Sequence, residues 1–166
     1  MKSVCALFSA ATVLVVLAAS APAQVNRDDL TPLEISYTTR LSEDRQRVHV
    51  TFEVDHVARP TMHLAMPNWT PGAYGIGRYG ERVEDLTVLG GSGEELSVTR
   101  LDHQTWSVDT AGVRRLQASY TVPARRRSRG RGQDPAEPTG VRISGPSTYL
   151  YVRGAKHLPV TARYEV

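Results

Sequence analysis

Alternation between apolar and polar residues dominates this chain from residue 33 onward. The clearest segment is residues 47–55, where polar neighbours separate apolar residues at every second position: Val48, Val50, Phe52 and Val54. A period of two places successive side chains on opposite faces of a strand, so the pattern is typical of a half-buried antiparallel strand. The same alternation recurs at residues 33–37, 96–98 and 116–122.

Shorter apolar segments predict further strands at residues 61–66, 105–108, 149–152 and 158–164. Residues 83–88 fit either a strand or a helical turn. Turn-forming residues separate the segments at 42–45, 90–93 and 109–112. About eight to nine short strands with regular turns predict an all-β domain with an antiparallel, sandwich-like architecture.

The first residues have the pattern of a secretory signal peptide. Lys2 precedes an apolar run from Val4 to Ala19, and the small residues Ala21-Pro22-Ala23 follow. A membrane-spanning anchor is the alternative, but the strongly apolar part is short for a span of ~20 residues. We therefore expect a signal peptide at 1–23, a leader at 24–32 and a β domain at 33–166. The mature chain would then be exported, periplasmic or extracellular, without a stable membrane anchor.

Charge changes this picture only locally, because the formal net charge of the whole chain is +3. Five arginines fall between residues 125 and 131, in a Pro- and Gly-containing segment that predicts a flexible loop at about 124–146. A solvated loop and a contact with an anionic partner both fit. No aromatic residue lies between Pro123 and Ser147 to stack on bases, so we expect no nucleic-acid partner.

The common catalytic motifs are missing from the chain. A zinc site of the H-E-x-x-H type needs two histidines four residues apart with a glutamate after the first, and none of the five histidines has that spacing: His49, His56, His63, His103 and His157. No serine lies in a G-x-S-x-G motif, and the only cysteine, Cys5, lies within the predicted signal peptide. We expect no catalytic residue, no metal and no cofactor in this chain, which should be inactive by itself.

Residues 75–80 match G-x-G-x-x-G literally. Dinucleotide binding through that motif requires a preceding strand and a following helix within a βαβ unit. Here the motif follows a proline-containing turn in an all-β context. These glycines therefore favour close backbone approach over cofactor binding.

The most distinctive segment is Met66-Pro67-Asn68-Trp69-Thr70-Pro71-Gly72-Ala73-Tyr74. Pro71-Gly72 is a turn dipeptide, because proline sets φ and glycine permits a positive φ. The turn would present Trp69 and Tyr74 from a tightly bent loop. The alternative is that Trp69 fills the core between two sheets, since large aromatic residues contribute mainly to burial.

This segment resembles the hallmark W-T-P-G-x-Y of the glycyl aminopeptidase family, zinc metallopeptidases of the gluzincin group. Weaker similarities follow in the expected order at residues 81–83, 90–93, 102–108, 119–124 and 149–151. The family has an N-terminal β domain, a helical catalytic domain with H-E-x-x-H and a C-terminal PDZ-type domain. This chain resembles only the first. It departs from the family at Gly77-Arg78, where relatives typically carry a charged or polar pair.

The resemblance implies a non-catalytic domain of an exported metallo-aminopeptidase. Its partners would be the catalytic and PDZ-type domains and a peptide substrate, with zinc bound in the catalytic domain outside this chain. The candidate residues for the substrate cleft or domain interface are Trp69, Thr70, Pro71, Gly72, Tyr74 and Arg78. Two alternatives stay open: a stand-alone exported module that binds a peptide or glycan, and a nonfunctional truncated remnant.

Overall fold

A computed structural model describes residues 33–126 and 141–165. The predicted signal peptide, the leader and the centre of the arginine-rich segment lie outside the described residues. The elements are β1 (Glu34–Leu41), β2 (Arg47–Asp55), β3 (Thr61–Ala65), η2 (Tyr79–Arg82), β4 (Glu84–Gly90), β5 (Val98–Arg100), β6 (Thr105–Asp109), β7 (Arg115–Pro123), β8 (Arg125–Arg126), β9 (Val141–Arg142), α1 (Gly145–Thr148), β10 (Tyr151–Val152) and β11 (Val160–Glu165).

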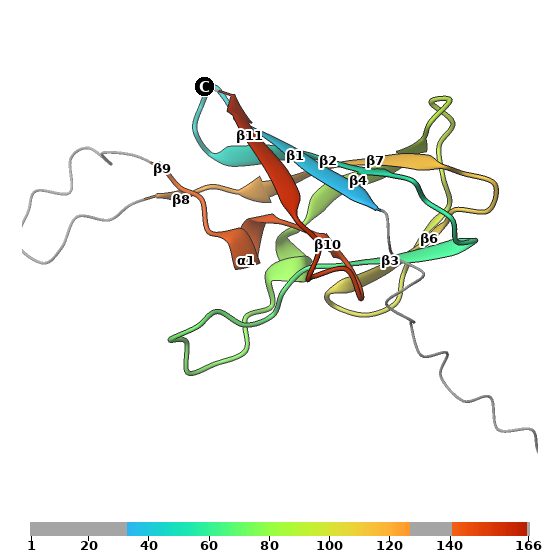
Figure 1. Ribbon diagram of the computed structural model, residues 1–166. Coiled ribbons are helices and arrows are strands. Elements are labelled where there is room, and N and C mark those ends of the chain that lie inside the picture. Colours follow the sequence, from blue (N-terminus) through green and yellow to red (C-terminus); the bar gives the residue numbers. More distant parts are fainter. Residues whose placement is uncertain (1–32, 127–140, 166) are drawn as a thin grey trace, which may run out of the picture.

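Two sheets face each other across one core (Figure 1). The larger has five strands in the order β11-β1-β2-β7-β4, and the smaller has four in the order β10-β3-β6-β5. A short ribbon, β8-β9, extends from the larger sheet. The predicted all-β sandwich is therefore confirmed, with one difference in strand direction: β11 runs parallel to β1, although every other pairing between described strands is antiparallel.

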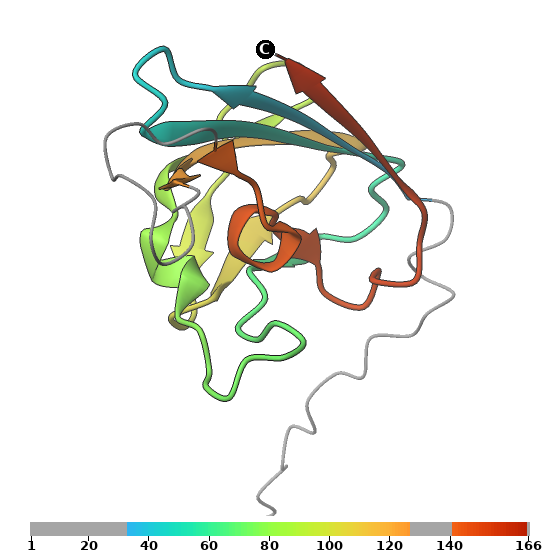
Figure 2. The same ribbon diagram turned by 90° about the vertical axis from the view of Figure 1, so that its left-hand side faces the viewer.

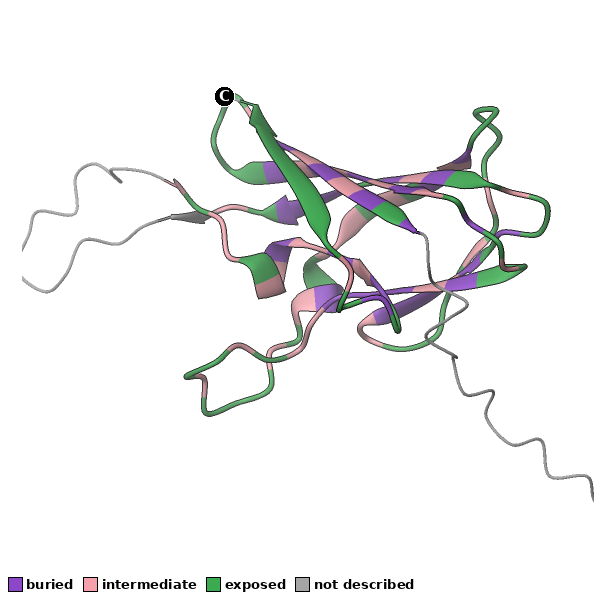
Figure 3. Ribbon diagram, in the orientation of Figure 1, coloured by how far each residue is buried: buried purple, intermediate pink, exposed green. Residues whose placement is uncertain are grey.

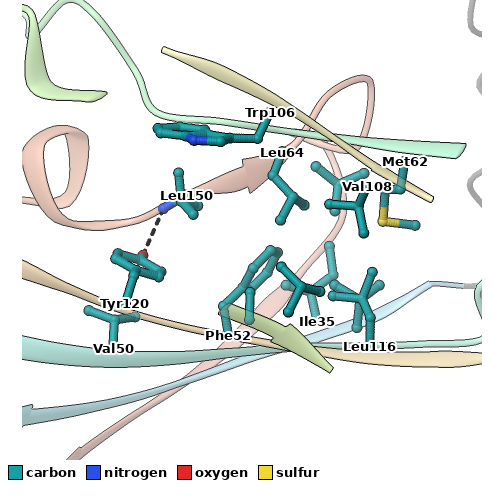
Figure 4. Packing of buried hydrophobic residues seen from close by; sticks show 14 of the residues in the cluster. Ile35, Val50, Phe52, Met62, Leu64, Trp106, Val108, Leu116, Tyr120 and Leu150 are labelled. Atoms are coloured by element: carbon teal, nitrogen blue, oxygen red, sulfur yellow. Dashed lines mark hydrogen bonds between the residues drawn. The ribbon is translucent and has the colours of Figure 1, made fainter. Parts of the chain in front are cut away.

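The core forms as the period-two pattern predicts. In β2 the four apolar side chains at alternate positions are buried and the residues between them are partly exposed. Phe52, Ile35 and Leu116 point inward from the larger sheet, and Leu64 and Val108 point inward from the smaller one (Figure 4). Sandwich cores pack alternate side chains of two facing sheets in this way.

The last part of the domain differs most from the pattern. Tyr149 was expected to begin a strand, but its backbone N–H bonds to the carbonyl of Gly145 (3.0 Å) and ends helix α1. Leu150 then donates its N–H to the buried hydroxyl of Tyr120 (3.0 Å; Figure 4). The strand is therefore shortened to Tyr151–Val152.

The ends of the arginine-rich segment form regular structure that the sequence did not predict. Arg125–Arg126 pairs antiparallel with Val141–Arg142. The helix α1 follows almost at once, with a proline in its first turn, a position where the missing N–H costs nothing. The chain thus returns to the sandwich three residues after the ribbon. Within this segment, residues 127–140 lie outside the described residues.

Candidate functional site

The segment between β3 and η2, residues 67–78, forms a projecting loop that we call the hallmark loop. Figure 2 shows it extending away from both sheets. Trp69 is 51% exposed, and Tyr74 and Ile76 are more exposed still. The alternative that Trp69 fills the core is therefore wrong, and the tryptophan packed between the sheets is Trp106, which is 5% exposed.

A turn at the tip of the hallmark loop orients the indole. Ala73 donates its N–H to the carbonyl of Thr70 (3.0 Å), and Gly72 adopts a φ of 84°. Proline followed by a residue with positive φ is the signature of a type II turn. The Trp69 Nε1–H donates back to the carbonyl of Ala73 (3.0 Å), so the ring lies across the turn with its polar atom satisfied.

Two further hydrogen bonds close the neck of the hallmark loop. The backbone N–H of Gly77 donates to the carbonyl of Asn68 (2.6 Å), and the hydroxyls of Thr70 and Tyr79 lie 3.2 Å apart. The Tyr79 ring occupies the space that a side chain at position 77 would fill, so any larger residue there would displace the ring. The loop is therefore cross-linked at its neck while its tip is exposed.

Both ends of the hallmark loop rest on one turn, residues 101–104, which joins β5 to β6. Met66 donates its N–H to the carbonyl of Gln104 (2.8 Å). Gly80 packs its backbone directly on the backbone of His103 and Gln104. Because both ends contact the same turn, the position of that turn determines where the loop projects.

Arg100 connects the base of the hallmark loop to the turn at residues 101–104. Its Nη2 donates to the carbonyls of Gly80 (3.2 Å) and His103 (3.0 Å), and its Nε donates to the carbonyl of Asp102 (3.0 Å). The guanidinium carbon lies 5.3 Å from the centroid of the Trp106 ring, within the range of a cation–π interaction. One planar guanidinium group therefore binds one carbonyl at the base of the loop and two carbonyls in the turn.

The candidate residues do not all gather in one place. Trp69, Thr70, Pro71 and Gly72 build the turn, and Tyr74 points into solvent beyond it. Arg78 lies at the neck and forms an ion pair with Glu81 three residues later. It is therefore a partnered cation at the base of the loop, separate from the tip.

The residues that sequence reasoning missed are Ile76, Tyr79, Arg100 and Gln104. The glycines at 77 and 80 signalled close backbone approach, as predicted, but did not say to what. Arg100 lies twenty residues from Gly80, and no local pattern links an arginine on a short strand to a loop that far away.

An apolar hollow of about 410 Å³ begins beside Pro67 at the start of the hallmark loop. Its other walls come from β1, from the segment between α1 and β11, and from β11 itself, where Val160 and Ala162 line it. Tyr149 also lines it, and burial raises the pKa of this hydroxyl to about 12. The tyrosine thus stays neutral at physiological pH, and the hollow suits apolar side chains.

No group of three metal-ligating side chains occurs within residues 33–126 and 141–165. His103 lies in the turn at the base of the loop, beside Asp102, whose carboxylate accepts the N–H of Gln104 (2.7 Å). These residues do not fit a catalytic zinc ion. In the same described ranges, no helix is long and apolar enough to cross a membrane.

Comparisons with known proteins bear on the fold and the family of this chain. A crystal structure of an aminopeptidase N family protein from Idiomarina loihiensis has the same fold, with a TM-score of 0.63 and 18% sequence identity. The match covers 79% of this chain but only 22% of that protein. A search of the curated proteins found no match. The family of peptidase M61 N-terminal domains matches residues 36–166, which is most of the chain. This chain belongs to the peptidase M61 N-terminal domain family.

Proposed function

We propose that this chain is the non-catalytic N-terminal domain of an exported zinc aminopeptidase, and that its hallmark loop faces the cleft that receives the peptide. One observation carries the proposal: the loop holds Trp69, Tyr74 and Ile76 in solvent on a hydrogen-bonded neck. Exposed apolar clusters usually mark a binding surface. In a member of this family, a cleft of the catalytic domain is the natural surface for them to meet.

The internal bonding of the loop supports this role. The N–H groups of Ala73 and Gly77 pair with the carbonyls of Thr70 and Asn68, and the Thr70 hydroxyl lies within hydrogen-bond distance of Tyr79. These bonds hold the loop while the aromatic surfaces of Trp69 and Tyr74 stay exposed. Rigid aromatic side chains offer a large contact area at a low cost in conformational entropy, which suits recognition of a peptide end.

The apolar hollow supports the second part of the proposal, packing on a catalytic domain. It opens on the same side as Pro67, so a domain that covered it would also lie against the start of the hallmark loop. Zinc, the H-E-x-x-H residues and the PDZ-type domain belong to parts of the enzyme outside this chain. In this arrangement the chain shapes the cleft and contributes no catalytic group.

Kinetics can test the loop. In an enzyme that carries this domain together with its catalytic part, Tyr74→Ala should lower kcat/KM for peptides about two- to tenfold, because one aromatic contact contributes about 0.5–1.5 kcal/mol. Tyr164→Ala is the matched control, since Tyr164 is also an exposed tyrosine but lies on β11, outside the loop and the turn that supports it. Equal kinetics for the two variants, with unchanged melting temperatures, would overturn the proposed role.

The exposed aromatic tip also favours a second candidate, a stand-alone exported module that binds a peptide or glycan. Two measurements separate it from the enzyme domain and from a nonfunctional remnant. The first is the mass of the native protein in the exported fraction, which should be several times that of this chain if the enzyme proposal holds. The second is titration of the purified chain with peptides and oligosaccharides, followed by Trp69 fluorescence, with Trp69→Phe as control. Saturable binding by the chain alone would support the module.

A further inference from the structure

Among the described strands, four form the edges of the two main sheets, and three of these are poor templates for another strand. β5 has three residues and β10 has two. In β4 the pairing with β7 shifts between Glu84 and Thr87, and Asp85 between them has a φ of 54°. Short length and bulges are devices by which natural proteins protect sheet edges. The fourth edge, β11, has six residues and contains no bulge, proline or glycine.

The side chains of β11 are exposed along its whole length (Figure 3). They include two large apolar residues, Val160 at 54% and Tyr164 at 59% exposure. These residues lie two positions before and two positions after Ala162, so all three share one face of the strand. An exposed apolar edge of this kind is a site where another strand adds.

We propose that β11 pairs antiparallel with β11 of a second copy of this chain, about a two-fold axis through Ala162. A two-fold axis perpendicular to the sheet keeps the inner faces of both copies on one side, as continuation of the five-stranded sheet requires. Val160 then lies opposite the partner's Tyr164, and Thr161 lies opposite the partner's Arg163. A β-branched residue opposite an aromatic residue is a favourable cross-strand pair.

The distribution of charge favours a second copy as the occupant. Arg163 and Glu165 cancel in net charge, and neither forms an ion pair with another described residue. Antiparallel pairing brings the end of β11 that carries Glu165 toward the exposed turn before the partner's strand, which carries Lys156 and His157. In this register no two like charges lie directly opposite each other.

One position tests both the occupant and the register. Thr161→Glu would place a carboxylate opposite the partner's Arg163 twice in the dimer, and Thr161→Arg would place like charges there twice. Both variants are made in the full chain with Cys5→Ser and measured by sedimentation equilibrium. The dimer dissociation constant of Thr161→Glu should be at least about tenfold lower than that of Thr161→Arg. A chain that stays monomeric at millimolar concentration would overturn the proposal. Equal dissociation constants for the two variants would also overturn the proposal. That result is expected if the apolar segment 4–19 drives the association.

Disulfide trapping checks the axis. Residues directly opposite each other in an antiparallel pair have Cα atoms about 4.5–5.5 Å apart, within the range that a disulfide bridges. Ala162→Cys should therefore oxidise to a covalent dimer, whereas Thr99→Cys, on the exposed edge strand β5, should not. Equal cross-linking of the two variants would contradict the register. Neither result depends on the hallmark loop, so the proposed role of that loop in the peptide cleft stands or falls separately.

Discussion

Replacing Gly80 by alanine tests whether the hallmark loop is held by close backbone packing. A methyl group at position 80 would lie 2.7 Å from the Cα of Gln104 and closer still to the carbonyl oxygen of His103. Both obstacles are backbone atoms, so no side-chain rotation can relieve the overlap. Either η2 or the turn at residues 101–104 must move, and Arg100 then loses the geometry that joins them.

The size of the effect follows from the packing. Forcing an extra carbon into a filled site typically costs about 1–3 kcal/mol. For a domain of this size, each kcal/mol lowers the melting temperature by about 3–6 °C. We therefore expect Gly80→Ala to lower the midpoint of thermal unfolding by about 3–18 °C.

Circular dichroism of the purified chain measures this midpoint. Gly75→Ala is the matched control, because a methyl group at position 75 meets no atom within 4 Å and Gly75 does not have a positive φ. That substitution should leave the midpoint unchanged or raise it slightly, since alanine restricts the unfolded chain. If the two variants melted within about 1 °C of each other, the argument from backbone contact would be refuted.

Three further predictions concern the core, the hydrogen bonds of Arg100 and the buried tyrosines. Phe52→Ala should destabilise the domain by about 3–5 kcal/mol in urea unfolding, because a fully buried ring leaves a cavity; a loss below about 1 kcal/mol would contradict the packing. Arg100→Lys should lower the free energy of unfolding by about 1 kcal/mol, because an ammonium cannot reach three carbonyls at once. An unchanged unfolding midpoint would show that these hydrogen bonds do not stabilise the domain. Burial raises the pKa of Tyr120 above its ordinary value and that of Tyr149 to about 12, so both hydroxyls stay protonated in the folded state above the unfolded pKa near 10. Their contribution to stability is therefore present below about pH 10 and lost as pH rises toward 12, and the urea midpoint should fall across that range; Tyr149→Phe should make the fall shallower.

Strand positions and the orientation of their side chains could be predicted from the sequence because they depend on local alternation. In β2 the burial of Val48, Val50, Phe52 and Val54 follows directly from a period of two. The exposed turn at Pro71-Gly72 was predictable for a related reason, since proline and glycine restrict the backbone by their own chemistry. The short helix α1 was not, because its four residues form no hydrophobic period.

The candidate site was only half predictable. The motif located Trp69, Thr70, Pro71, Gly72 and Tyr74, but it did not separate core packing from exposure for Trp69. That outcome depends on which tryptophan fits between the sheets, and Trp106 occupies that place. The exposure of a side chain depends on the packing of the whole domain, so the sequence of one segment does not predict it.

The sequence by itself determined an all-β sandwich, the position of a bent aromatic loop and the lack of an H-E-x-x-H zinc motif, because periodicity, turn chemistry and ligand spacing are local properties. Only the tertiary structure decided that Arg100, Gly80 and Gln104 meet at the base of the loop, and that β11 runs parallel to β1 as an open edge. Those features join residues far apart in the chain. They depend on which strands pair and on how the two sheets stack, and the local pattern of residues specifies neither.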